Sequence, residues 1–127
     1  MIEQIPGMPA GTIGFRARGK LTAADYENVI VPDIEAAFTL HRKLRILYAM
    51  AGDFDGFEPR ALWDDAKLGL RHFTGFERVA VVADDASLRK TVHLLEAVIP
   101  ADVREYESDD FAKAMAWICE PPIDGGR

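Results

Sequence analysis

The sequence predicts an α/β fold with a five-stranded, mixed but mostly parallel sheet and about four helices. Two segments carry this prediction, Leu44–Met50 and Arg78–Ala83, because both are apolar at consecutive positions and not only at alternate ones. A strand that is apolar on both faces belongs inside a parallel sheet that helices cover on each side. Segments with helical periodicity separate most of the strands, and such connections place successive strands in parallel.

The chain opens with two predicted strands. Residues 1–5 form the first, and the nearby Pro6 and Pro9 favour a position at the edge of the sheet. Residues 12–18 form the second, because apolar and polar side chains alternate there.

A long helix is predicted from Thr22 to about His41. Thr22 is a suitable N-cap, and Asp25 stands where a capping box needs its second member. The helical period continues through Pro32, so we expect one helix with a kink at this proline; two helices in series are the alternative.

Three basic residues follow this helix and lead into the central strand: Arg42, Lys43 and Arg45. We expect them to be exposed to solvent. An anion site is the less favoured interpretation of this corner.

The helix with the clearest start signal is predicted from Pro59 to Phe73. Proline is well tolerated at the first helical position, where its missing N–H is not needed, so Glu58 falls at the N-cap. Arg60 and Asp64 are four residues apart and are expected to form a pair on the solvent-facing side.

The last third of the chain completes the alternation of helices and strands. A helix is predicted over Ser87–Ile99, where Pro100 stops it, and a short strand over Val103–Tyr106. Ser108 is the expected N-cap of a final helix.

Composition indicates one globular domain. The chain has 127 residues, of which 49% are hydrophobic and 28% charged. We expect residues 1–120 to form the domain and residues 121–127, rich in Pro and Gly, to form a flexible tail. A net charge of -6 disfavours a protein whose main contact is with nucleic acid phosphates or an anionic membrane surface.

The sequence also predicts a cytoplasmic protein without a transmembrane segment. The single Cys119 cannot form an intramolecular disulfide, and the first residues lack the basic flank and long apolar core of a signal peptide. No run approaches the length of about 20 apolar residues that a membrane span needs.

Taken together, these segments resemble the SpoIIAA-like family, which is related to the STAS domains of sulfate transporters and anti-sigma factor antagonists. The resemblance extends over nearly the whole chain. Its residues are Gly19–Thr22 with Asp25, Tyr26 and Pro32, then Leu47, Tyr48 and Asp53–Phe57, Leu62–Asp65, Lys67–His72, Phe76–Val82, Asp84, Ala116 and Trp117. The resemblance implies a STAS-like fold, similar also to that of CRAL-TRIO lipid-transfer domains, and a small non-enzymatic module.

One feature of the related STAS antagonists is missing. The phosphoregulated members carry a Ser in the loop and helix start that follow the central strand, whereas no Ser or Thr occurs here from Leu44 to Phe73. The sequence therefore predicts no phosphorylation at that position, and it gives no support to an anti-sigma partnership that depends on it.

The loop after the central strand is the candidate site, because parallel α/β sheets bind ligands beyond the carboxyl ends of their strands. The predicted contacts of a ligand or partner are Asp53, Phe54, Asp55, Phe57 and Trp63. Core packing or a subunit contact is the favoured role of the three aromatic residues, and an apolar-ligand cleft is the alternative.

No metal or cofactor site is predicted. The pattern Asp53-x-Asp55-Gly56 covers only a fragment of a calcium loop, so acidic helix caps are favoured over a weak divalent cation site. His41, His72 and His93 lack the spacing of metal ligands and are expected to be unrelated.

The predicted function is a non-catalytic binding or regulatory module that acts through protein contacts, as a homodimer. An enzyme is not predicted, because no nucleophile motif, dinucleotide loop or phosphate loop occurs. The alternative is a carrier or sensor of a small apolar or lipid-like molecule. An enzyme that uses Asp53 or Asp55 as a general base ranks below both.

Overall fold

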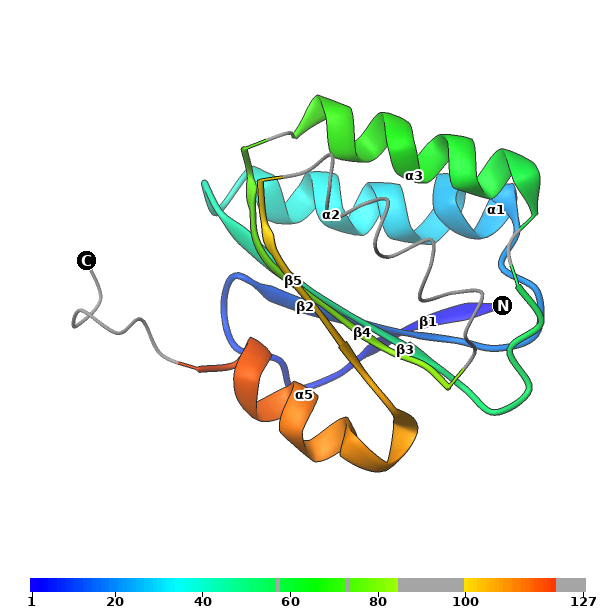
Figure 1. The fold of residues 1–127 in the computed structure, drawn as a ribbon. Helices are drawn as coiled ribbons and strands as arrows, with labels where there is room; N and C mark the ends of the chain where they lie inside the picture. The colour runs from blue at the N-terminus through cyan, green and yellow to red at the C-terminus, as the bar shows by residue number, and fades with distance from the viewer. Residues whose placement is uncertain (57, 73, 85–99, 121–127) are drawn as a thin grey trace.

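Figure 1 shows the computed structural model of the chain. The structure describes residues 1–56, 58–72, 74–84 and 100–120, apart from the side chains of residues 62, 63, 65, 66, 69 and 70. The expected helix Ser87–Ile99 and the expected tail 121–127 lie outside the described residues.

The strands form one five-stranded sheet in the order β1-β2-β3-β4-β5. Their bounds are β1 (Ile2–Ile5), β2 (Thr12–Ala17), β3 (Leu44–Met50), β4 (Phe76–Val82) and β5 (Asp102–Tyr106). The first strand lies at an edge and runs antiparallel to β2, while the pairs β2–β3, β3–β4 and β4–β5 are parallel. The predicted mixed, mostly parallel sheet is therefore confirmed.

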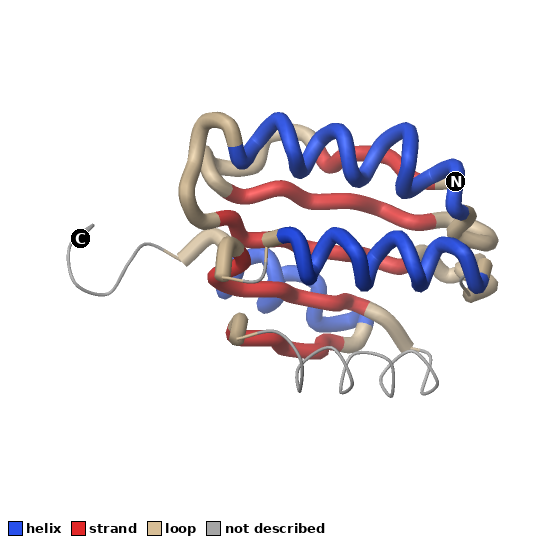
Figure 2. The backbone as a smooth tube through the Cα atoms, turned by 90° about the horizontal axis from the view of Figure 1, so that it is seen from above, coloured by secondary structure: helices blue, strands red, loops and turns tan. Residues whose placement is uncertain are grey.

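Helices cover both faces of this sheet. Figure 1 shows α1, α2 and α3 above one face and α5 below the other, and Figure 2 shows α3 lying alongside the helix formed by α1 and α2. The helical bounds are α1 (Ala23–Asp25), the π-helical turn η1 (Tyr26–Ile30), α2 (Val31–Phe38), α3 (Pro59–Arg71), the short 3-10 turn η2 (Ser108–Asp110) and α5 (Phe111–Ile118).

The start of α1 has the predicted capping box. The Thr22 hydroxyl accepts a hydrogen bond from the Asp25 N–H at 3.2 Å, and the Asp25 carboxylate accepts one from the Thr22 N–H at 2.9 Å. Two backbone donors that no helical carbonyl could satisfy are thereby paired at the helix start.

The helix continues through Pro32, as predicted, but it ends at Phe38 rather than near His41, and a π-helical turn precedes the proline. The Val31 N–H bonds to the carbonyl oxygen of Tyr26, five residues earlier. Proline lacks the N–H for the usual bond four residues back, and its ring crowds the preceding turn. The wider π turn removes that conflict, so the chain stays helical from Ala23 to Phe38.

The central strand β3 contributes to both hydrophobic layers. Leu44 and Ile46 belong to the cluster under α1, α2 and α3, whereas Leu47 and Ala49 belong to the cluster that includes residues of α5. All four side chains are buried. This arrangement explains why the strand is apolar on both faces and confirms the prediction of an interior strand.

Arg45 differs from the sequence expectation. Arg42 and Lys43 are exposed, but Arg45 is only 8% exposed. Its guanidinium donates to the Ile118 carbonyl oxygen at 3.2 Å, to the Glu120 carbonyl oxygen and to a Glu77 carboxylate oxygen at 3.0 Å. The prediction of a solvent-exposed residue is wrong here, because the end of α5 supplies acceptors that permit burial.

Two further arginines secure the end of α5. Arg78 donates to the Trp117 carbonyl oxygen at 2.9 Å, and its guanidinium carbon lies 5.0 Å from the centre of the Trp117 ring. The Arg104 guanidinium lies 4.5 Å from the same ring centre. Positive charge near the last carbonyls of a helix complements the helix dipole, so these contacts hold α5 against the sheet.

The start of α5 also differs from the expectation. Ser108 does not cap α5 directly; it begins η2, and Asp110 occupies the N-cap position without a side-chain bond. The Ser108 hydroxyl and N–H instead donate to the two carboxylate oxygens of Asp84, at 2.6 and 2.9 Å. Ser108 thus joins the ends of β4 and β5.

Candidate functional site

The loop that follows β3 is fixed through its backbone. The Ala51 N–H donates to the Ala17 carbonyl oxygen at 2.9 Å, and the Asp55 N–H to that of Gly19 at 2.7 Å. The Leu21 N–H donates in return to the Gly56 carbonyl oxygen at 2.9 Å. This segment therefore extends the β2–β3 pairing beyond the sheet, and backbone hydrogen bonds hold its shape.

Gly56 permits the turn that brings the loop back to Leu21. Its φ is 94°, in a region of backbone conformation that residues other than glycine rarely adopt. The Glu58 N–H then donates to the Leu21 carbonyl oxygen at 2.8 Å, directly before α3 begins. Glu58 is the N-cap of α3 and Pro59 is its first residue, as predicted.

The two aspartates of the candidate site point their charge to solvent. Asp53 and Asp55 are both exposed. Within the described part of the chain, neither carboxylate takes part in a hydrogen bond or an ion pair. The fixed loop thus presents two carboxylates that no cation among the described residues neutralises.

Of the three aromatic residues of the predicted site, the structure describes only the side chain of Phe54. Phe54 is half-buried and packs against the hydrophobic cluster under α1, α2 and α3. Phe57 and the side chain of Trp63 lie outside the described residues. The structure therefore assigns Phe54 in part to the core, while the proposed aromatic cleft stays a prediction.

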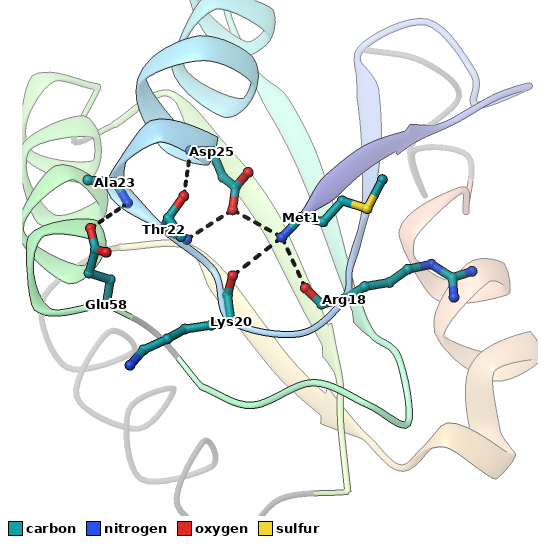
Figure 3. A network of polar contacts seen from close by, with 7 residues as sticks. All are labelled: Met1, Arg18, Lys20, Thr22, Ala23, Asp25 and Glu58. Atoms are coloured by element: carbon teal, nitrogen blue, oxygen red, sulfur yellow. Dashed lines mark hydrogen bonds and ion pairs between the residues drawn. The ribbon is translucent and has the colours of Figure 1, made fainter.

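Carboxylates of the chain itself occupy the start of α1, next to this loop. Glu58 accepts a hydrogen bond from the Ala23 N–H at 3.1 Å, and Asp25 accepts the Thr22 N–H. Figure 3 shows both contacts, and it also shows the Met1 amine donating to the carbonyl oxygens of Arg18 and Lys20 and to Asp25. The donors that could attract an external anion to this helix start are already paired.

This network sets the protonation of Asp25. Burial of the carboxyl raises its pKa, but the hydrogen bonds from the Thr22 N–H, the Met1 amine and the Thr22 hydroxyl lower it, together with the positive charge of that amine. The net result is a pKa below the ordinary value of 3.8. Asp25 is therefore a carboxylate under all but strongly acidic conditions.

Sequence reasoning missed Asp64. It was expected to pair with Arg60 on the solvent-facing side of α3, but Arg60 pairs with Glu27 of η1, at 3.1 Å between Nη2 and Oε1. Asp64 is only 7% exposed. It shares the inward face of α3 with Ala61 and Leu68, which are 0% and 4% exposed.

The Asp64 carboxylate has one paired and one unpaired oxygen. Its Oδ1 lies 3.4 Å from the Lys67 Nζ. Its Oδ2 is buried and, within the described residues, has no hydrogen-bond partner. The spacing of Ala61, Asp64 and Leu68, three and four residues apart, is the sequence signal that could have placed this carboxylate on the buried side.

His72, at the end of α3, contacts two side chains of α2. Its imidazole contacts the Glu35 carboxylate and stacks on the Phe38 ring, with ring centres 4.0 Å apart. Arg71 lies near the other oxygen of Glu35, at 3.8 Å. In the parts of the chain that the structure describes, no group of three or more His, Cys, Asp or Glu side chains could hold a metal ion.

Among the described helices, none has the length and apolar character that a membrane crossing requires. This finding concerns only α1, α2, α3 and α5 and the turns that adjoin them.

Comparisons with known proteins agree with this architecture. Residues 12–119 match the family described as SpoIIAA-like. A crystal structure of an uncharacterized protein from Shewanella loihica, with a SpoIIAA-like fold, superposes with a TM-score of 0.73 at 28% sequence identity. The match covers 94% of this chain and 93% of that one. No curated protein matches the sequence.

Proposed function

Because this chain belongs to the SpoIIAA-like family, we propose that it is a non-catalytic cytoplasmic module that acts through contacts with other proteins, itself as a homodimer. One observation carries the proposal: the loop after β3 is fixed by backbone hydrogen bonds and presents Asp53 and Asp55, whose carboxylates have no partner in the described part of the chain. The loop lies at the carboxyl end of a central parallel strand, where α/β proteins place their binding sites.

The chemistry of the loop favours a partner with basic side chains. Two exposed carboxylates attract Arg or Lys of a partner, and Arg binds a carboxylate through two parallel hydrogen bonds. Since the backbone of the loop is already ordered, binding costs little conformational entropy there. The loop is unsuited to pairing with a second copy of itself, because like charges would face each other on chains of net charge -6.

The test compares proteins captured by the wild type with those captured by the double variant Asp53→Asn/Asp55→Asn. Each substitution removes a charge and keeps the size of the side chain. Asp109→Asn is the matched control, because Asp109 is also exposed but lies in η2. The partner that the double variant loses is then purified and titrated by calorimetry.

We expect the purified partner to bind the double variant at least tenfold more weakly than the control variant. Binding of the wild type should also weaken as salt is raised from 50 to about 300 mM, because the contact is between exposed charges. Equal affinities of the double variant and the control, or a set of captured proteins that the double variant leaves unchanged, would contradict the proposal.

Asp64 supports a second candidate function, the carrier of a small apolar molecule. A buried carboxylate oxygen without a hydrogen-bond partner is costly, and a ligand with a hydroxyl or ammonium group would supply the missing donor. This residue lies on α3 beside Trp63, which belongs to the predicted aromatic site. The favoured ligand therefore has an apolar body and one donor group.

Decanol and decylamine test the carrier function against decanoate, which has the same chain but an anionic head group. We expect the first two to raise the melting temperature of the wild type, and decanoate to leave it unchanged because two carboxylates repel. Asp64→Ala should abolish the shifts. Equal shifts for all three compounds, or shifts that persist in Asp64→Ala, would argue against this candidate.

A further inference from the structure

The strand β5 is an open edge of the sheet. It pairs with β4 on one side, and among the described residues no strand lies on its other side. It lies at the opposite end of the strand order from β1. An edge strand carries unpaired N–H and C=O groups and can accept a strand from another chain.

The register of β5 shows which backbone groups face outward. The Tyr106 carbonyl oxygen accepts the Ala83 N–H at 2.9 Å, so the backbone of Tyr106 faces β4. Alternate residues of a parallel strand bond the same neighbour, so Asp102 and Arg104 face β4 as well. The backbone N–H and C=O of Val103, between them, point to the side opposite β4, along the open edge of the sheet.

Two opposite charges flank Val103. The side chains of Asp102 and Arg104 are 54% and 53% exposed and lie on one face of the sheet, because side chains alternate along a strand. Within one chain their charged groups are 4.0 Å apart, an exposed and weak ion pair that pairing across an interface would replace. The Trp117 ring under the Arg104 guanidinium holds that side chain on the face that α5 covers. The Val103 side chain points to the opposite face and is buried in the core, so the edge presents the Val103 backbone between one negative and one positive side chain.

In a twofold antiparallel pairing of two β5 strands, backbone groups that point to the open edge of one strand must bond those of the other. This requirement permits only a few positions of the twofold axis, and we compare three of them. With the axis at Asp102, this carboxylate faces its own copy, and with the axis at Arg104, two guanidinium groups face each other. With the axis at Val103, Asp102 of each chain lies opposite Arg104 of the other, twice.

We propose that a second copy of this chain pairs with β5 in antiparallel orientation, with the twofold axis at Val103. The two Val103 residues exchange both backbone hydrogen bonds, and the two Asp102–Arg104 pairs close across the axis. The pairing joins two five-stranded sheets into one continuous sheet. The inference names the interface of the homodimer in the proposed function and leaves the loop after β3 available to another partner.

Charge reversal on either side of the axis tests this interface by sedimentation velocity at several protein concentrations. Asp102→Arg places only positive charges across the axis, and Arg104→Asp places only negative charges there. We expect each variant to dimerise at least tenfold more weakly than the wild type. The double variant Asp102→Arg/Arg104→Asp restores opposite charges and should dimerise again, and an equimolar mixture of the two single variants should form heterodimers.

Two further variants complete the experiment. Glu3→Arg reverses an exposed charge on β1, at the other edge of the sheet, and should leave the dimer unchanged. Arg104→Gln removes the charge but keeps a side chain over Trp117, so it covers the case in which Arg104→Asp fails to fold. Circular dichroism of every variant confirms that the fold is retained.

The results separate this interface from the function of the loop. A wild type that stays monomeric at 200 μM, or single variants that dimerise as tightly as the wild type, would overturn the β5 interface. Neither result affects the experiment on partner binding by the Asp53→Asn/Asp55→Asn variant, because that experiment tests the loop after β3 independently of dimerisation. Weaker dimers of the single variants together with a dimer of the double variant would establish the Val103 register, because with the axis at residue 102 or 104 the exchanged residue would face its own copy and like charges would still meet.

Discussion

Arg45 at the start of the central strand donates a hydrogen bond to the carbonyl oxygen of Ile118, 73 residues later, at 3.2 Å. Its guanidinium also bonds the Glu120 carbonyl oxygen and the Glu77 carboxylate. One buried side chain thereby ties β3 and β4 to the end of α5. The contact fixes the helix that alone, among the described helices, covers this face of the sheet.

Replacing Arg45 is expected to loosen α5. Arg45→Leu removes three hydrogen bonds and leaves two carbonyl oxygens unpaired, so the free energy of unfolding should fall by roughly 2 to 4 kcal/mol. Urea unfolding monitored by tryptophan fluorescence measures the change. Arg42→Leu is the control, because Arg42 is exposed and should change stability little. Equal stabilities of the two variants would show that the buried bonds contribute nothing.

Asp25 predicts a pH dependence of stability. Its folded pKa lies below the ordinary 3.8, so the unfolded chain binds this proton at higher pH than the folded chain does. The stabilisation is therefore complete above pH 3.8 and is lost as the pH falls below 3.8 through the folded pKa. Urea unfolding between pH 2.5 and 7 should show a steeper acid loss in the wild type than in Asp25→Asn. Parallel curves would contradict the assignment.

Replacing Asp64 with an apolar residue is expected to stabilise the protein. In ligand-free protein, Asp64→Leu replaces a buried carboxylate that has an unpaired oxygen by an apolar group of similar size. The free energy of unfolding should rise by about 1 to 3 kcal/mol, because the desolvation cost of the charge disappears. Thermal and urea unfolding check this. A less stable variant would indicate that the carboxylate has a partner and stabilises the fold.

The turn before β4 packs so closely against α2 at Gly75 that we expect it to tolerate no side chain there. A Cβ at this position would lie 2.6 and 2.8 Å from two ring carbons of Phe38, closer than side chains pack. Gly75→Ala should therefore lower stability by roughly 1 to 3 kcal/mol. Gly52→Ala is the matched control, since a Cβ there meets nothing within 4 Å. Similar melting temperatures for both variants would rule out the predicted crowding.

The sequence determined those parts of the fold that depend on near neighbours. The capping box of Thr22 and Asp25 and the start of α3 at Pro59 are confirmed, since all the groups involved lie within a few residues of one another. The interior strands followed from their apolar character on both faces. In the candidate site, sequence reasoning placed Asp53 and Asp55 in the loop after the central strand, because that strand is recognisable from its apolar residues; their role in binding stays a prediction.

Only the tertiary structure decided that the charged side chain of Arg45 is buried. Arg45 looked like part of an exposed basic corner and Asp64 like half of a surface pair, but both are buried. A charge can leave water only where other groups compensate it, and the acceptors for Arg45 come from residues 118 and 120. Distant partners of this kind leave no pattern in the local sequence, so the fold had to bring them together before they could be seen.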